Sequence, residues 1–242
     1  MKHSNVVSGE TSRRPALRRD EIVTRGFAIL PEALTQRDIS RLAESLNQTQ
    51  LARSRAGMRH ALKHPAVVAT ARDPRLLGIA REILGCDPFP FRATLFDKNP
   101  VSNWLVVWHQ DTALPLRERR EIAGWGPWSV KDGVIYAHAP ASALSRVVSL
   151  RLHLDNSTSE NGPLRVLPGT HTMGVLNDDA IHRLSTEVTV FECQVPRGGI
   201  LVMKPLIVHA SSKSRSAMSR RVLHIEYSAS QGFTDGLELA VG

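Results

Sequence analysis

The part of the chain after about residue 90 is a succession of short segments with the character of β-strands. Each segment is apolar or alternates apolar and polar residues, and turn-forming pairs such as Asn-Gly, Pro-Gly and Gly-Gly lie between them. Many short strands in succession favour an antiparallel barrel or a jelly roll. We therefore predict a mainly β fold with flanking α-helices. The segments read FRATLFDK, NWLVVWHQD, VVSLRLHLD, GPLRVLPGTH, TEVTVFECQV, GGILVMKPLIVHAS and RRVLHIEYSA.

Two capped helices are predicted ahead of these strands. Residues 34–47 carry an apolar stripe at helical spacing, and Thr35 is the predicted N-cap, with Asp38 in the position that completes a capping box. In residues 72–85 the predicted N-cap is Asp73, a proline occupies the first turn and a glycine ends the helix. Both patterns fit helices that cover one face of a sheet.

The length of 242 residues suits one large domain. The first residues are basic and polar and lack the apolar core of a secretory signal, so we predict a flexible tail at 1–20 and a cytoplasmic protein. Residues 21–242 are predicted to form a single domain that opens with a short strand at 25–30. Between two predicted strands lies a long insert at about 112–144, which we interpret as a lid because long loops in compact domains are usually functional covers.

Charge and composition narrow the class of partner. The 31 Lys and Arg outnumber the 23 Asp and Glu, which gives a net charge of +8. This charge is compatible with an anionic small-molecule substrate, and because the arginines are spread along the chain a solvated basic surface is the simpler interpretation. Aromatic residues are only 5% and no nucleic-acid-binding module is recognisable, so we expect no nucleic acid partner. Apolar runs are too short to span a membrane, and two cysteines make no disulfide framework. No prediction of the oligomeric state follows.

The segment NWLVVWHQD places a histidine and an aspartate at the end of an apolar run. Alternate side chains of a strand share a face, so His109 and Asp111 point to the same side as Val107. Trp104 and Trp108 fall on the other face and are interpreted as packing residues. An imidazole and a carboxylate on one face are two of the three ligands of a non-haem iron(II) site. Such pairs also arise by chance and hydrogen-bond to each other, so a distant second histidine is needed.

The best second histidine is His209. It ends the segment GGILVMKPLIVH and precedes a polar turn, a position expected at the mouth of a barrel. Arg220 follows eleven positions later and shares a strand face with His224, whereas Arg221 falls on an apolar face suited to packing against helices. We therefore predict that Arg220 points inward, where a guanidinium binds a carboxylate through two parallel hydrogen bonds.

Four motifs in the same order resemble those of the phytanoyl-CoA dioxygenase family. They are WHQD, ENGPLRVLPGTH, GGILVMKPLIVHAS and the arginine eleven positions after the last histidine. This family consists of iron(II)- and 2-oxoglutarate-dependent oxygenases, and the likeness runs from residue 25 to about residue 230. The resemblance implies a double-stranded β-helix of the jelly-roll or cupin-like type. It also implies an enzyme that hydroxylates a small molecule with dioxygen while 2-oxoglutarate is converted to succinate and carbon dioxide.

The resemblance carries over to individual residues. His109, Asp111 and His209 would bind iron(II) and form the catalytic centre, and Arg220 would hold the distal carboxylate of 2-oxoglutarate together with Ser211. Three ligands on one face of an octahedral ion leave three positions for a bidentate 2-oxo acid and dioxygen. Related halogenating enzymes have a small residue in place of the carboxylate, so an aspartate here favours hydroxylation.

Arg151 departs from the family pattern, in which a tryptophan can stand beside the co-substrate. It alternates onto one face with His153 and Asp155, so the pocket is predicted to be more polar than usual. We predict that Arg151 binds the anionic co-substrate or an anionic substrate. The alternative is a structural ion pair with Asp155 or Glu226.

Two further functions are compatible with parts of this pattern. One is a jelly-roll module that binds a ligand without catalysis, and the joint presence of His109, Asp111, His209 and Arg220 argues against it. The other is a cupin-like metalloenzyme that uses no 2-oxoglutarate, which the spacing of Arg220 disfavours. A hydrogen-bonded polar cluster without metal is the structural alternative for the three ligand candidates.

Overall fold

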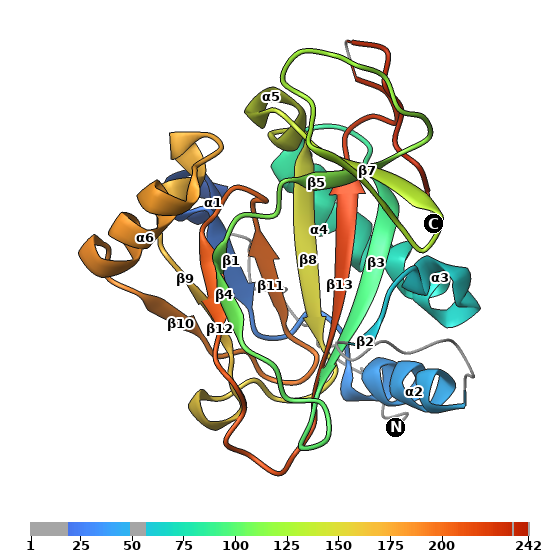
Figure 1. Cartoon of the computed structure of the whole chain (residues 1–242). Helices are drawn as coiled ribbons and strands as arrows, with labels where there is room; N and C mark the ends of the chain where they lie inside the picture. The colour runs from blue at the N-terminus through green and yellow to red at the C-terminus, as the bar shows by residue number, and fades with distance from the viewer. Residues whose placement is uncertain (1–18, 49–56, 234, 242) are drawn as a thin grey trace, which may run out of the picture.

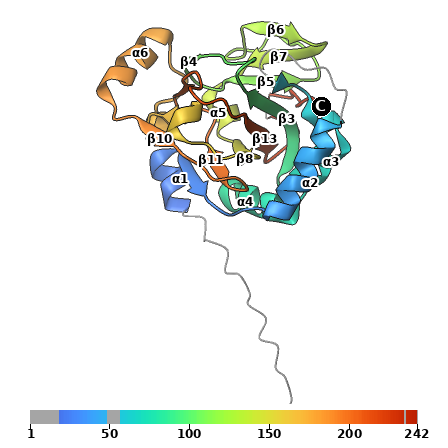
Figure 2. The same ribbon diagram turned by 90° about the horizontal axis from the view of Figure 1, so that it is seen from below.

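The computed structural model describes residues 19–48, 57–233 and 235–241, so most of the predicted tail lies outside the described residues. Two antiparallel sheets face each other and enclose the middle of the molecule (Figures 1 and 2). The larger sheet has the strand order β1-β11-β8-β13-β3-β2, and the smaller one has the order β10-β9-β12-β4. This is a jelly roll, and the predicted fold class is confirmed.

The larger sheet separates an apolar layer from a polar interior. Leu150 on one central strand and Leu223 and Tyr227 on the next are fully buried against the helices. The alternate residues Arg151 and His224 are register partners and face the opposite sheet. The sheet contains β1 (Phe27–Leu30), β2 (Gly57–Met58), β3 (Phe89–Lys98), β8 (Val147–His153), β11 (Ile200–Met203) and β13 (Arg220–Ser228).

Helices cover the outer face of the larger sheet (Figure 2). Both predicted caps are confirmed, because Thr35 and Asp38 form the capping box and the Asp73 carboxylate accepts from the backbone N–H of Arg75. The helices on this face are α1 (Arg19–Arg25), α2 (Gln36–Asn47), α3 (Pro65–Ala71) and α4 (Pro74–Leu84). Two helices lie outside it, α5 (Ala141–Leu144) and α6 (Asp178–Glu187). None of the helices in the described part of the chain is long and apolar enough to cross a membrane.

The smaller sheet corrects two expectations. The segment GGILVMKPLIVHAS is two strands in different sheets, because Pro205 has no N–H for a strand ladder and residues 204–208 cross from one sheet to the other. The predicted strand TEVTVFECQV is also shortened, since α6 extends to Glu187. The smaller sheet consists of β4 (Val106–His109), β9 (Leu164–Val166), β10 (Phe191–Cys193) and β12 (His209–Ser211).

Strand β4 departs from simple alternation. Its register with β12 pairs His109 with His209 but Val106 with Ser211, so β4 has one more residue than β12 between the two pairs, a β-bulge. The bulge places Val106 and His109 in the same cavity wall and leaves Val107 exposed. The expectation that Val107 shares a face with His109 was therefore wrong.

The predicted insert folds as a third sheet at one end of the barrel (Figure 1). Its order is β5-β7-β6, and the turn between β6 and β7 is Asp132-Gly133, in which both residues have positive φ, 51° and 79°. Two such residues make the two-residue turn that suits the twist of a hairpin, and glycine adopts positive φ without strain. The strands are β5 (Ala113–Leu116), β6 (Trp128–Lys131) and β7 (Val134–His138).

Candidate metal centre and adjoining cavity

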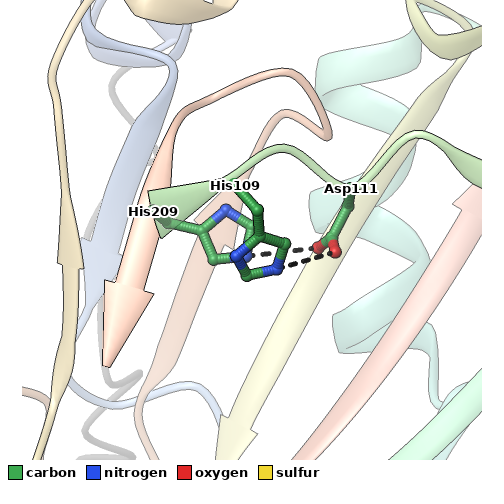
Figure 3. Close-up of side chains that lie close together, drawn as sticks. All are labelled: His109, Asp111 and His209. Atoms are coloured by element: carbon green, nitrogen blue, oxygen red, sulfur yellow. Dashed lines mark ion pairs between the residues drawn. The ribbon is translucent and has the colours of Figure 1, made fainter. Parts of the chain in front are cut away.

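The three predicted metal ligands lie together between the two sheets (Figure 3). His109 and His209 are register partners on β4 and β12, and Asp111 follows β4 at a point where its N–H donates to the carbonyl of Pro205 at 3.0 Å. The Nε2 atom of each histidine lies 3.6 Å from one oxygen of the Asp111 carboxylate. One ligand atom from each residue falls within 4.8 Å of the other two, a spacing suited to a single ion.

Backbone carbonyls orient both imidazoles. Nδ1 of His109 lies 2.8 Å from the carbonyl of Val107, and Nδ1 of His209 lies 2.9 Å from the carbonyl of Ile207. Because a carbonyl only accepts, each Nδ1 carries the proton and each neutral ring presents the lone pair of Nε2 toward Asp111. This fixed tautomer is the one that a metal site of this kind requires.

The electrostatics of the three residues also fit a cation. Burial lowers the pKa of His209 to about 4, which keeps its imidazole neutral at physiological pH. Burial would raise the pKa of Asp111, but His209 and His109 hold it well below its usual range, so the carboxylate is ionised. Burial opposes protonation of His109 as well, yet its contact with Asp111 raises its pKa above the ordinary value. Above the raised pKa of His109, the site offers the neutral and anionic donors that iron(II) accepts.

A cavity of about 430 Å³ adjoins the three residues and has two distinct ends. The inner end is lined by Lys98, Ser211 and Arg220, where β3, β12 and β13 meet. The other end is lined by Arg92 and by residues of the insert sheet, including Tyr136. His109, Asp111 and His209 line the same cavity.

Arg220 points into this cavity, as predicted. Its side chain is buried, and its Nε donates to the carbonyl of Asn161 at 3.1 Å. Burial and then the charge of Arg151 lower the pKa of Arg220 to about 10, so the guanidinium stays charged at neutral pH.

Ser211 lies beside Arg220, and its hydroxyl donates to the carbonyl of Gly162 at 2.9 Å. Arg221 lies on the other face of β13 and pairs with Asp155.

Sequence reasoning missed Lys98, the register partner of Arg220. The side chain is completely buried, and its ammonium group donates to the Ser211 hydroxyl at 2.8 Å and to the carbonyl of Ser212 at 2.5 Å. It also lies 5.2 Å from the ring centre of Trp104, which lines the cavity although it was interpreted as a packing residue. Burial, and then the charges of Arg220 and Arg151, lower the pKa of Lys98 to about 7.

Arg151 lies inside the barrel between the metal ligands and the inner end. Its guanidinium packs 5.2 Å from the ring centre of Phe96, and its Nη1 donates to Nδ1 of His224 at 3.0 Å. Its charge acts on Asp111 as well as on Arg220. The two carboxylates that were the alternative partners of Arg151 form their ion pairs elsewhere.

Asp155 pairs with Arg221 at 2.8 Å, and Glu226 pairs with Arg92 through both carboxylate oxygens. Arg151 and Arg220, together with Lys98 in its protonated form, therefore bring three cationic side chains to one buried region. Buried charges of one sign repel and cost free energy unless an anion joins them. The inner half of the cavity is accordingly suited to an anionic ligand.

The class of protein follows from this site together with the family comparison. The family model "Phytanoyl-CoA dioxygenase (PhyH)" matches residues 28–222, and the chain belongs to this family. The predicted resemblance is confirmed.

Among curated proteins, the chain is 28% identical over 182 residues to L-proline trans-4-hydroxylase of Streptomyces griseoviridis, covering 64% of this chain and 60% of that protein. It is 26% identical over 188 residues to ectoine dioxygenase of Halomonas elongata, covering 70% of this chain and 50% of that protein. The chain thus matches only half to three fifths of the length of these relatives.

Solved structures agree on the fold. EctD from S. alaskensis with 2-oxoglutarate and 5-hydroxyectoine superposes with a TM-score of 0.67 at 17% identity, covering 94% of this chain and 79% of that chain. HygX from Streptomyces hygroscopicus with nickel and 2-oxoglutarate gives a TM-score of 0.65 at 16% identity, covering 94% of this chain and 96% of that chain. At these identities the likeness establishes the jelly-roll architecture.

Proposed function

We propose that this protein is an iron(II)- and 2-oxoglutarate-dependent dioxygenase that hydroxylates a small anionic molecule and releases succinate and carbon dioxide. The observation that carries the proposal is the placement of His109, Asp111 and His209 beside a buried cluster of cations. Family membership supports the same activity.

In this proposal the three ligands hold iron(II) on one side and leave the cavity side open for the 2-oxo acid and dioxygen. Iron and 2-oxoglutarate supply the oxidising chemistry when bound. Arg220 and Ser211 hold the distal carboxylate of the co-substrate, and the ammonium group of Lys98 adds a third contact. Arg151 lies along the path from the metal ligands to this end and contacts the co-substrate.

The relatives support a small free metabolite as substrate, because their names specify L-proline and ectoine. A cytoplasmic location stays a prediction from the sequence. The insert at about 112–144 is proposed to cover the substrate, since its sheet lines the outer end of the cavity. A cupin-like enzyme without 2-oxoglutarate fits the structure less well, because it gives the buried cations Lys98 and Arg220 no anion to bind.

The test is an anaerobic titration of iron(II) and 2-oxoglutarate into the metal-free protein. A weak visible charge-transfer band is expected from the chelated 2-oxo acid in the wild type. His209→Ala should abolish the band, and Arg220→Ala should shift its half-saturation to higher 2-oxoglutarate. Arg183→Ala, on the exposed surface of α6, is the control for loss of one arginine. Absence of the band in folded, metal-loaded wild type would refute the proposal.

A further inference from the structure

The outer end of the cavity is built by three segments that are distant in sequence. The segment after β2 contributes Arg59 and His60, β3 contributes Arg92, and the insert sheet contributes Lys131 and Tyr136. The metal ligands separate this end from the cations that we assign to the co-substrate. Side chains here are therefore available to the substrate.

One of the cations at the outer end, Arg92, already has a carboxylate partner that balances its charge. The guanidinium of Arg92 donates to both oxygens of Glu226, and its Nη1 donates to the carbonyl of Ala113 at 3.0 Å. Glu226 is buried, so the two residues form a neutral internal pair. The Arg92–Glu226 pair closes the inner side of the substrate end and leaves no net charge there.

Lys131 differs from Arg92 because its charge is not balanced. It is the last residue of β6, next to the Asp132-Gly133 turn, so the hairpin holds its backbone at the cavity wall. Its ammonium group lies 5.4 Å from the ring centre of Tyr136. In the described part of the chain Lys131 forms no ion pair with a carboxylate. An ammonium group in this position is open to an anionic ligand.

Arg59 lies across the same opening and contacts the hairpin. Its Nη1 is 3.4 Å from the carboxylate of Asp132, an exposed and long contact, and within the described ranges no second carboxylate pairs with this guanidinium. Asp132 is thus the single acidic side chain that faces both Arg59 and His60 among the described ion pairs. Two cations and one exposed carboxylate leave a net positive charge at the opening.

His60 adds an independent observation. Its backbone is in the left-handed region, with φ of 53°, which is uncommon for a residue other than glycine and is found disproportionately at functional sites. Its Nε2 is buried, has no hydrogen-bond partner among the described residues and lies 3.9 Å from the carboxylate of Asp132. An unpaired buried nitrogen costs free energy that a ligand oxygen recovers. In the tautomer with the proton on Nε2, the residue therefore donates a hydrogen bond next to Arg59.

We propose that Arg59, Lys131 and Nε2 of His60 bind an oxyanion group of the substrate, a carboxylate or a phosphate. This inference rests on the proposed function, because it uses the metal ligands and the co-substrate end to define which part of the cavity remains. The bound anion lies on the far side of the metal ligands from the distal carboxylate of 2-oxoglutarate, so the two anions are held apart. The carbon to be oxidised then lies between the anion site and Asp111.

The experiment measures binding of matched charged and neutral probes to the protein loaded with Ni(II) and saturated with 2-oxoglutarate without oxygen. Saturation blocks the inner cations, and nickel prevents turnover. The carboxylate arm compares benzoate with benzamide, and the phosphate arm compares phenyl phosphate with phenol. Binding of each probe is measured by titration calorimetry. The proteins are the wild type, the double variant Arg59→Met/Lys131→Met and the control Arg183→Met, which also loses a positive charge on the exposed surface of α6.

In the wild type and the control, at least one charged probe should bind about tenfold or more tightly than its neutral partner, since a charge-assisted contact is made only by the anion. The double variant should lose this preference. The arm with the larger preference distinguishes carboxylate from phosphate. Absence of any preference in the wild type, including absence of binding, or an unchanged preference in the double variant would overturn the anion site.

The charge-transfer band of iron and 2-oxoglutarate separates this result from the proposed function. The band should be the same in the double variant and the wild type, because neither substituted residue lies at the co-substrate end. A normal band without anion preference refutes the anion site alone. Absence of the band in the wild type refutes the proposed function.

Discussion

His109 and His209 lie opposite each other on neighbouring antiparallel strands, with their ring centres 4.2 Å apart. Two protonated imidazoles at this distance would repel each other strongly. Burial keeps His209 neutral by lowering its pKa to about 4, whereas contact with Asp111 outweighs burial and raises the pKa of His109. As the pH rises, His109 is therefore the last of the three residues to release its ionisable proton, and both neutral rings keep the proton on Nδ1.

Metal binding should depend on pH through this proton. A metal ion binds only neutral imidazole, so the affinity for Ni(II) or iron(II) should fall about tenfold per pH unit below the raised pKa of His109. Above that pKa the affinity should level off. Calorimetric titration of Ni(II) in buffers of different ionisation enthalpy measures both the affinity and the proton released. A pH-independent affinity without proton release would contradict this assignment.

Lys98 should make 2-oxoglutarate binding weaken at alkaline pH. Burial and the neighbouring arginines lower its pKa to about 7, and a bound carboxylate favours the protonated form, so binding above pH 7 requires proton uptake. The affinity should fall up to about tenfold per unit above pH 7 until the unprotonated protein binds as well. Lys98→Met should weaken binding at pH 6 and abolish the pH dependence, whereas Lys213→Met should change neither. The band titration measures both effects.

The same lysine should make the folded protein more stable as the pH rises, whereas it should make 2-oxoglutarate binding weaker. The pKa of Lys98 is about 7 in the folded protein and 10.5 is its ordinary value, so between these values the unfolded chain holds a proton that the folded chain does not. The contribution of Lys98 to the free energy of unfolding should therefore rise with pH in this window. Urea denaturation of the metal-free wild type and Lys98→Met at pH 7 and 9 measures it. An equal change in both proteins would exclude Lys98 as the cause.

Gly162 should tolerate no side chain, because it positions Ser211. It has φ of +65°, its carbonyl accepts from Ser211, and a Cβ atom would lie 2.3 Å from the carbonyl oxygen of Ser212. Gly162→Ala should lower both stability and 2-oxoglutarate affinity. Gly85→Ala is the matched control, since Gly85 has φ of +73° and open space around it. This substitution should lower the free energy of unfolding by about 1 kcal/mol through backbone strain alone. Equal losses in the two variants would show that the close contact is unimportant.

Tyr227 should stabilise the packing of the helices on the larger sheet. Its hydroxyl is buried and donates to the carbonyl of Ala71 at the end of α3 at 2.8 Å. Tyr227→Phe keeps the ring but leaves this carbonyl without the donor, so the free energy of unfolding should fall by about 1–2 kcal/mol. Urea denaturation measures the loss, and 2-oxoglutarate binding should be unchanged. A stability equal to that of the wild type would show that the hydrogen bond contributes nothing.

The sequence by itself determined the fold class, the two capped helices and the residues that gather at the candidate metal centre. These features are local or carried by motifs, because strand period, caps and the order of His109, Asp111, His209 and Arg220 are all legible along the chain. The inward position of Arg220 was also predictable, since Arg221 falls on the face of β13 with the apolar residues that pack on the helices.

The tertiary structure alone decided which further residues reach the cavity. The bulge in β4 depends on the register with β12, so alternation misplaced Val107, and the position of Trp104 beside Lys98 could not be read from spacing. Lys98 became visible only as the register partner of Arg220. The opening that joins Arg59 to Lys131 arises where separate segments pack together. Contacts between segments distant in sequence depend on strand register and packing, which leave no periodic signal in either segment.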